Sequence, residues 1–96
     1  MTENLIDFDA TIFGPDGKRW TSSACGRIAD DGLWEGWIEF TAIDGSGVRI
    51  RTRRETEQPN RAALFYWATG LTHVYLDGAL RRAIDSSHSA PAQPPS

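Results

Sequence analysis

The chain has only one cysteine, Cys25, and only two histidines, His73 and His88. One cysteine excludes an internal disulfide framework and any metal site built on paired thiolates. The two histidines lack the i,i+4 spacing of a helical metal site. The acidic turns 30–32 and 44–47 have no later glutamate to complete a calcium loop, and no Gly-Lys-Ser/Thr follows the glycines of a phosphate loop. We therefore predict no metal ion and no cofactor.

Long hydrophobic runs are also missing. No apolar stretch approaches the roughly eighteen residues that a membrane helix needs. The first ten residues, MTENLIDFDA, lack the basic and apolar regions of a signal peptide. The net charge of −3 argues against a protein dominated by electrostatic binding to nucleic acid. We expect a small cytoplasmic protein of bacterial type, with no membrane contact.

Four stretches between Leu5 and Thr52 alternate apolar and polar residues, which is typical of half-buried strands. Turn-forming residues at 14–17, 30–32 and 44–47 separate them. The pattern predicts an antiparallel meander of four strands. A sheet that curls into a partly open barrel is the alternative.

The register of this meander follows from the alternation of side chains between the two faces of each strand. A slip of one residue would exchange the two faces of the sheet. All apolar sets share one face in a single register, which pairs Ile12 with Trp20, Ile28 with Trp34, and Phe40 with Ile50.

On the opposite face the same register places Arg27 across from Glu35 and Glu39 across from Arg51. It also places Trp37 beside Arg53. Opposite charges that face each other across two strands contribute about 0.2–1 kcal/mol each. Apolar pattern, turns and charges therefore favour the same sheet.

Residues 60–69 and 73–84 have helical spacing instead. Asn60 is a suitable N-cap, and Gly70 is expected to end the first helix with a positive φ. Thr72 can cap the second helix. A hairpin turning at 77–78 is the alternative, but 79–84 lacks strand alternation. The chain is thus predicted to be a single α+β domain over 1–84, followed by a disordered Ser/Pro/Ala-rich tail over 85–96.

Gly26 and Gly36 lie opposite each other on the apolar face of the predicted sheet. The two missing side chains leave a depression there. We expect Trp67 or Tyr66 of the first helix to fill it.

No motif resembles the signature of a known family, and we predict a non-catalytic protein. His73 could act as a general base and Cys25 as a nucleophile, which would make a minor enzyme the distant alternative. Neither has a suitable partner nearby in sequence. We interpret His73 as a helix-terminal residue and Cys25 as an unreactive thiol.

The side chains that suggest binding are Trp37, Arg49, Arg51 and Arg53 on the polar face. Tryptophan and arginine are enriched in protein interfaces. We predict a binding or adaptor domain that contacts a protein partner or itself, a homodimer being the simplest form if Trp37 is exposed. Cover of Trp37 by a helix is an equal alternative. An oligonucleotide-binding module using the same residues ranks second, because basic strands with aromatic neighbours bind single strands.

Overall fold

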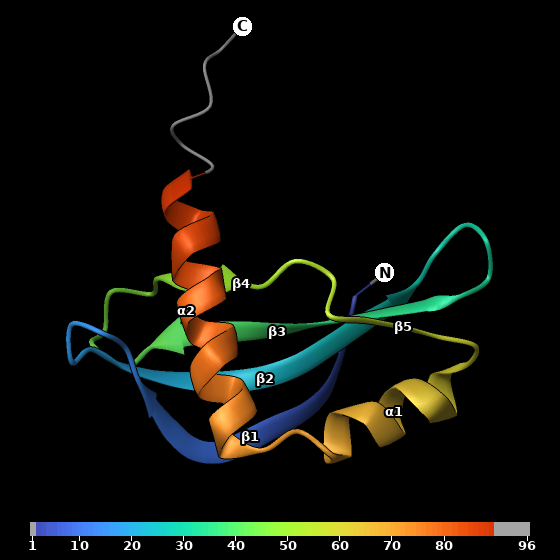
Figure 1. The fold of residues 1–96 in the computed structure, drawn as a ribbon, viewed down its shortest axis with the longest axis horizontal. Coiled ribbons are helices and arrows are strands. Elements are labelled where there is room, and N and C mark those ends of the chain that lie inside the picture. Colours follow the sequence, from blue (N-terminus) through green and yellow to red (C-terminus); the bar gives the residue numbers. More distant parts are fainter. Residues whose placement is uncertain (1, 90–96) are drawn as a thin grey trace, which may run out of the picture.

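Three long strands form the body of the sheet in the computed structural model, which describes residues 2–89 (Figure 1). They are β1 (Glu3–Phe13), β2 (Arg19–Ile28) and β3 (Trp34–Ala42). The turns between them contain Gly17 and Gly32 at φ 82° and 85°, a conformation that glycine adopts without a Cβ clash. The α+β meander predicted from the sequence is confirmed.

The register predicted from parity is also confirmed, at Ile12–Trp20, Ile28–Trp34 and Phe40–Ile50. The strand order is β1-β2-β3-β4, and the sheet is open rather than closed into a barrel. Pairing of β1 with β2 is irregular at two places, between Asn4 and Ile6 and between Phe8 and Ile12.

The second edge of the sheet differs from the expectation. The fourth strand, β4 (Arg49–Arg51), is shorter than the predicted alternation, and the polar link after it forms a further strand, β5 (Thr56–Gln58), which pairs with the start of β3. Between them Thr52 donates its N–H to Ile38 O at 2.9 Å, and its hydroxyl accepts the Ile38 N–H at 3.1 Å. The link is a strand because it pairs through its backbone, which requires no apolar side chains.

Helix α1 (Arg61–Thr69) begins where the sequence predicts it. The Asn60 side chain accepts the Ala63 N–H at 2.8 Å, as an N-cap does. The expected positive φ at Gly70 is wrong: Gly70 has φ −90° and continues in right-handed geometry.

Helix α2 (His73–Ser89) is capped by Thr72, whose hydroxyl accepts the Tyr75 N–H at 3.2 Å. The helix runs through Gly78, so the hairpin alternative is wrong. It also continues beyond the predicted end at 84 and the predicted start of the tail at 85. The remaining tail positions, 90–96, lie outside the described residues.

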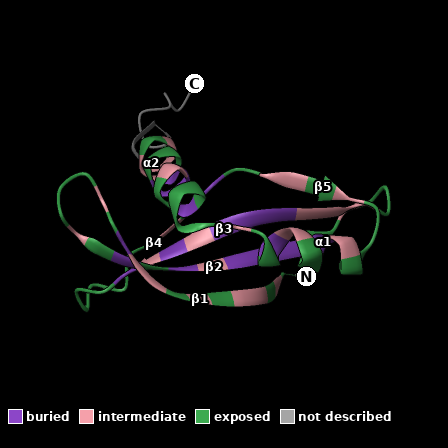
Figure 2. Cartoon of the chain, turned by 60° about the horizontal axis from the view of Figure 1, so that its bottom comes forward, coloured by how far each residue is buried: buried purple, intermediate pink, exposed green. Residues whose placement is uncertain are grey.

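Both helices pack on one face of the sheet, and α2 crosses the strands (Figures 1 and 2). The main core lies between α2 and the sheet and comprises Ile12, Trp20, Ile38, Phe40, Ala42, Leu76, Ala79, Leu80 and Ala83. Ile38 and Phe40 are buried in this core, so the apolar face of the sheet is the one that faces the helices.

Helix α1 covers the other end of the apolar face, at the pair Gly26–Gly36. A Cβ on Gly36 would lie 2.7 Å from Leu64 Cδ1 and 2.9 Å from Trp67 Cζ3. The depression is therefore filled by Leu64 together with Trp67. The alternative with Tyr66 is wrong, because Tyr66 is 80% exposed.

Neither described helix combines the length and the apolar character that crossing a membrane requires.

Candidate functional site

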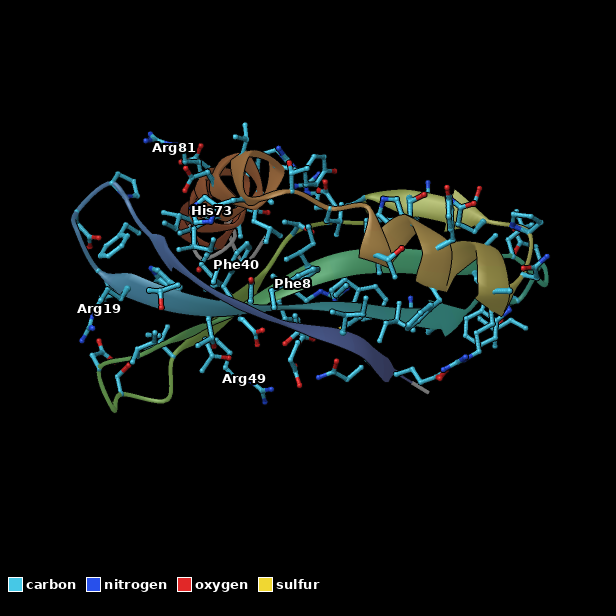
Figure 3. All side chains as sticks on the ribbon, turned by 90° about the horizontal axis from the view of Figure 1, so that it is seen from below. Phe8, Arg19, Phe40, Arg49, His73 and Arg81 are labelled. Atoms are coloured by element: carbon cyan, nitrogen blue, oxygen red, sulfur yellow. The ribbon has the colours of Figure 1, made fainter. Side chains whose placement is uncertain are left out.

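The sheet has a second face, which we call the outer face. It lies opposite the core side chains Ile38 and Phe40, because successive strand residues point to opposite faces. In the described part of the chain neither helix packs on it, and Figure 3 shows Arg19 and Arg49 on this side, away from His73 and Arg81. Its central residues are Asp7, Thr21, Ser23, Cys25, Arg27, Glu35, Trp37, Glu39, Thr41, Arg49 and Arg51.

Trp37 lies on this face but is only 2% exposed. The Arg51 guanidinium covers it, with its central carbon 4.3 Å from the ring centroid, and Trp37 Nε1 donates to Glu39 Oε2 at 3.3 Å. Cover by a helix, the alternative considered from the sequence, is wrong. The register had placed Arg53 beside Trp37, but the neighbour is Arg51.

The structure thus brings together three of the four predicted binding residues and separates the fourth. Trp37, Arg49 and Arg51 are neighbours on the outer face, whereas Arg53 lies in the link after β4. There Arg53 lines a hollow near α2 together with Glu55, Arg82, Asp85 and Ser86.

Arg54, which the sequence pattern did not single out, extends the charges of the outer face. Its Nη1 lies 3.5 Å from Glu35 Oε2 and 3.1 Å from a Glu57 oxygen. Arg27 Nε lies 3.3 Å from the other Glu35 oxygen, which confirms the predicted pair. This end of the outer face is therefore a network of mixed charge.

Charge on the central part of the outer face changes sign from one sheet edge to the other. Asp7 of β1 accepts hydrogen bonds from Asn4 at 3.0 Å and Ser23 at 2.7 Å. These bonds hold the pKa of Asp7 below its ordinary value, so the carboxylate is charged at neutral pH. On β4 the Arg49 side chain is 71% exposed and lies 3.9 Å from Glu39. The β1 side is acidic and the β4 side basic.

One end of the outer face carries exposed apolar side chains. Phe13 is 60% exposed and pairs in register with Arg19, while the Ile43 N–H donates to Arg19 O at 3.0 Å. Ile43 is 40% exposed. In this row across the sheet, the exposed apolar side chains of Phe13 and Ile43 lie on either side of Arg19.

Cys25 is the register partner of Trp37 and is buried. Burial raises the pKa of its thiol to about 12, and the negative charge of Glu39 adds to the shift. A thiol that keeps its proton at neutral pH is a poor nucleophile. His73, the other catalytic candidate, is exposed at the start of α2, and no hydrogen bond joins it to Asp77 within residues 2–89.

Across the molecule, Glu55 joins the link after β4 to α2. Its carboxylate accepts from the Tyr75 hydroxyl and from Arg82 Nη2, the latter at 2.6 Å. The Arg82 guanidinium lies 5.5 Å from the Tyr75 ring centroid. Burial and the Glu55 contact raise the pKa of Tyr75, so this tyrosine is no activated base.

An apolar hollow of about 280 Å³ lies on the core side, between α2 and the turn after β1. Trp20, Ile50 and Ile84 are among the residues that line it. The Trp20 indole N–H has no hydrogen-bond partner in the described part of the chain, but it is sealed from solvent. A ligand in the hollow could not reach it without displacing neighbouring atoms.

Within residues 2–89, no group of three or more His, Cys, Asp or Glu side chains is placed to hold a metal ion. Comparison of the chain with family models, curated proteins and solved structures finds no match.

Proposed function

We propose that the chain is a small non-catalytic binding domain that works by protein–protein contact through its outer sheet face. The observation that carries this proposal is that both helices pack on the opposite face. In the described residues, no helix therefore covers the outer face of strands β1 to β4.

The composition of the outer face supports a protein partner. Arginine is enriched in interfaces, and Arg49 and Arg51 project from β4. The exposed apolar pair Phe13 and Ile43 adds area that a partner could desolvate. Trp37 contributes from beneath, because the Arg51 guanidinium lies over its ring.

The chemistry of the candidate catalytic residues supports a non-catalytic role. The Cys25 thiol stays protonated at neutral pH, and His73 has no carboxylate to orient it among the described residues. A lone buried thiol fits a reducing compartment, so we place the protein in a bacterial cytoplasm.

The oligonucleotide alternative rests on the same arginines and on Trp37 as a stacking platform. Arg51 already covers the Trp37 ring, and Glu39 and Glu35 lie among the arginines. A salt titration of binding to a random single-stranded oligonucleotide separates the two functions. The protein-contact proposal expects no binding at low salt, whereas micromolar binding that falls steeply with salt favours the alternative.

Capture of partners with immobilised variants tests the surface itself. Arg49→Glu reverses a charge on the outer face, and Arg81→Glu makes the same change on α2, on the other side of the molecule (Figure 3). The proposal expects a protein, the chain itself included, that both wild type and Arg81→Glu retain and Arg49→Glu loses. If all three immobilised proteins retain the same partners equally, the outer face is not the binding surface.

A further inference from the structure

We propose that the partner at the outer face is a second copy of this chain, stacked face to face about a twofold axis that runs parallel to the strands. This inference rests on the proposed function and names the partner of the same surface. It follows from the layout of charge on the outer face and from the restricted set of symmetries that a homodimer can have.

The first step is the charge gradient. In one row across the sheet, Asp7 pairs with Ser23, Ser23 with Glu39, and Glu39 with Arg51. Asp7 and Arg51 stand at the two ends of this row, three strand spacings apart, or roughly 14 Å. They are too far apart to pair with each other within one copy. Asp7 accepts hydrogen bonds from the neutral groups of Asn4 and Ser23, and Arg51 lies over Trp37 across from Glu39, so each can also meet an opposite charge on another molecule.

The second step is symmetry. Two identical faces can stack about a twofold axis that is either perpendicular or parallel to the strands. A perpendicular axis sets β1 over β1 and β4 over β4, which brings acid to acid and base to base. A parallel axis sets β1 over β4 of the other copy. Like charges that face each other across an interface oppose association, so the charge gradient selects the parallel axis.

The third step is what this axis brings together. A row of residues then lies over the same row of the second copy in the reverse order. Asp7 meets Arg51 of the second copy, Ser23 meets Glu39, and in the row at the end of the face Arg19 meets Ile43 of the second copy. Stacked sheets lie about 10 Å apart and within roughly 30° of each other, so side chains of adjacent rows also interdigitate.

A charge-swap experiment tests this arrangement. The variants are Asp7→Arg, Arg51→Glu and the double variant, with Arg81→Glu on α2 as the control that matches the charge change of Arg51→Glu. Sedimentation equilibrium over a range of concentrations measures the dimer Kd, and circular dichroism checks the fold. Arg49→Glu is a second reversal on β4 that leaves the Trp37–Arg51 stack in place, should Arg51→Glu fail to fold.

The inference expects a wild-type dimer that weakens with added salt. Each outer-face reversal should raise Kd by about tenfold or more. The double variant should return toward the wild-type Kd, because its charges are exchanged between the two strands that meet, and Arg81→Glu should match wild type.

Two results would overturn the inference and leave the proposed function in place. One is a chain that remains monomeric at the highest soluble concentration while Arg49→Glu still loses a different captured protein. The other is a dimer that both single reversals weaken and the double variant does not restore. A dimer that no outer-face reversal affects would overturn both proposals.

Discussion

The Arg51 guanidinium lies over the indole of Trp37, with 4.3 Å between its central carbon and the ring centroid. This stack explains how a tryptophan can sit on a sheet face that no described helix covers and yet be almost fully buried. It also turns an apolar spot into a charged one. The face therefore presents arginine to a partner and keeps tryptophan as its support.

Arg51→Ala should uncover the Trp37 ring and lower the free energy of unfolding by about 0.5–2 kcal/mol, the range of a cation–π contact. Urea unfolding at low protein concentration measures the loss. Solvent exchange of the Trp37 indole N–H, followed by NMR, should become faster. The matched change Arg49→Ala should alter neither quantity, because its side chain is largely exposed. Equal behaviour of the two variants would mean that the stack does not protect Trp37.

Gly26→Ala should destabilise the fold by about 1–3 kcal/mol, as overpacking of a core does. The added Cβ would lie 2.8 Å from the backbone oxygen of Glu35 and would also clash with Leu64. Gly78→Ala is the control with the opposite sign. Its Cβ would meet only Arg82 at 3.6 Å, and alanine in a helix interior gains about 1 kcal/mol over glycine. Thermal unfolding of both variants checks the two signs.

Burial raises the pKa of Cys25 to about 12, above the value of about 8.5 for an unfolded cysteine. Between these two values the native state keeps its thiol proton and the unfolded state loses it. The free energy of unfolding should therefore fall as the pH rises from about 9 toward 12. Urea unfolding at several alkaline pH values should show a steeper fall for wild type than for Cys25→Ala, and parallel curves would contradict the burial of the thiol.

Glu55→Gln should loosen α2 from the link after β4. The Glu55 side chain is 10% exposed and accepts from both Tyr75 and Arg82. Hydrogen bonds to a charged group contribute about 1.5–3 kcal/mol, so we expect a loss of this order in urea unfolding. Glu57→Gln removes a more exposed partner of Arg54 and should cost less than about 1 kcal/mol. Similar losses for both would argue that Glu55 does not hold α2.

The long strands and their register could be predicted because one face is buried. Residues Trp34, Gly36, Ile38 and Phe40 alternate with residues of the outer face, and a single register brings them onto the same face as the apolar residues of the neighbouring strands. The same reasoning missed β5, which pairs through its backbone at the sheet edge and carries Thr56 to Gln58 without an apolar pattern. Edge strands of this kind leave little trace in the sequence.

Three of the four predicted members of the candidate site lie together on the outer face, but the contacts between them could not be predicted from the sequence. Parity places Trp37, Arg49 and Arg51 on one face, but the side-chain rotamers decide that Arg51 covers Trp37. Arg53 does not lie on the outer face, because β4 ends at Arg51 and the next residue, Thr52, turns its hydroxyl to the Ile38 N–H. The end of α2 was set too early because an established helix extends through weak helix formers at a small cost per residue.

The most direct test of the outer face as the working surface is a concentration series of two-dimensional amide NMR spectra. We predict that the peaks that shift with concentration belong to the central strands, above all the amides of Ser23, Glu39 and Thr41. Amides near the exposed side chains of Tyr66 on α1 and Val74 on α2 should stay in place. Shifts that gather on the helices, or spectra that do not change with concentration, would contradict contact between two outer faces.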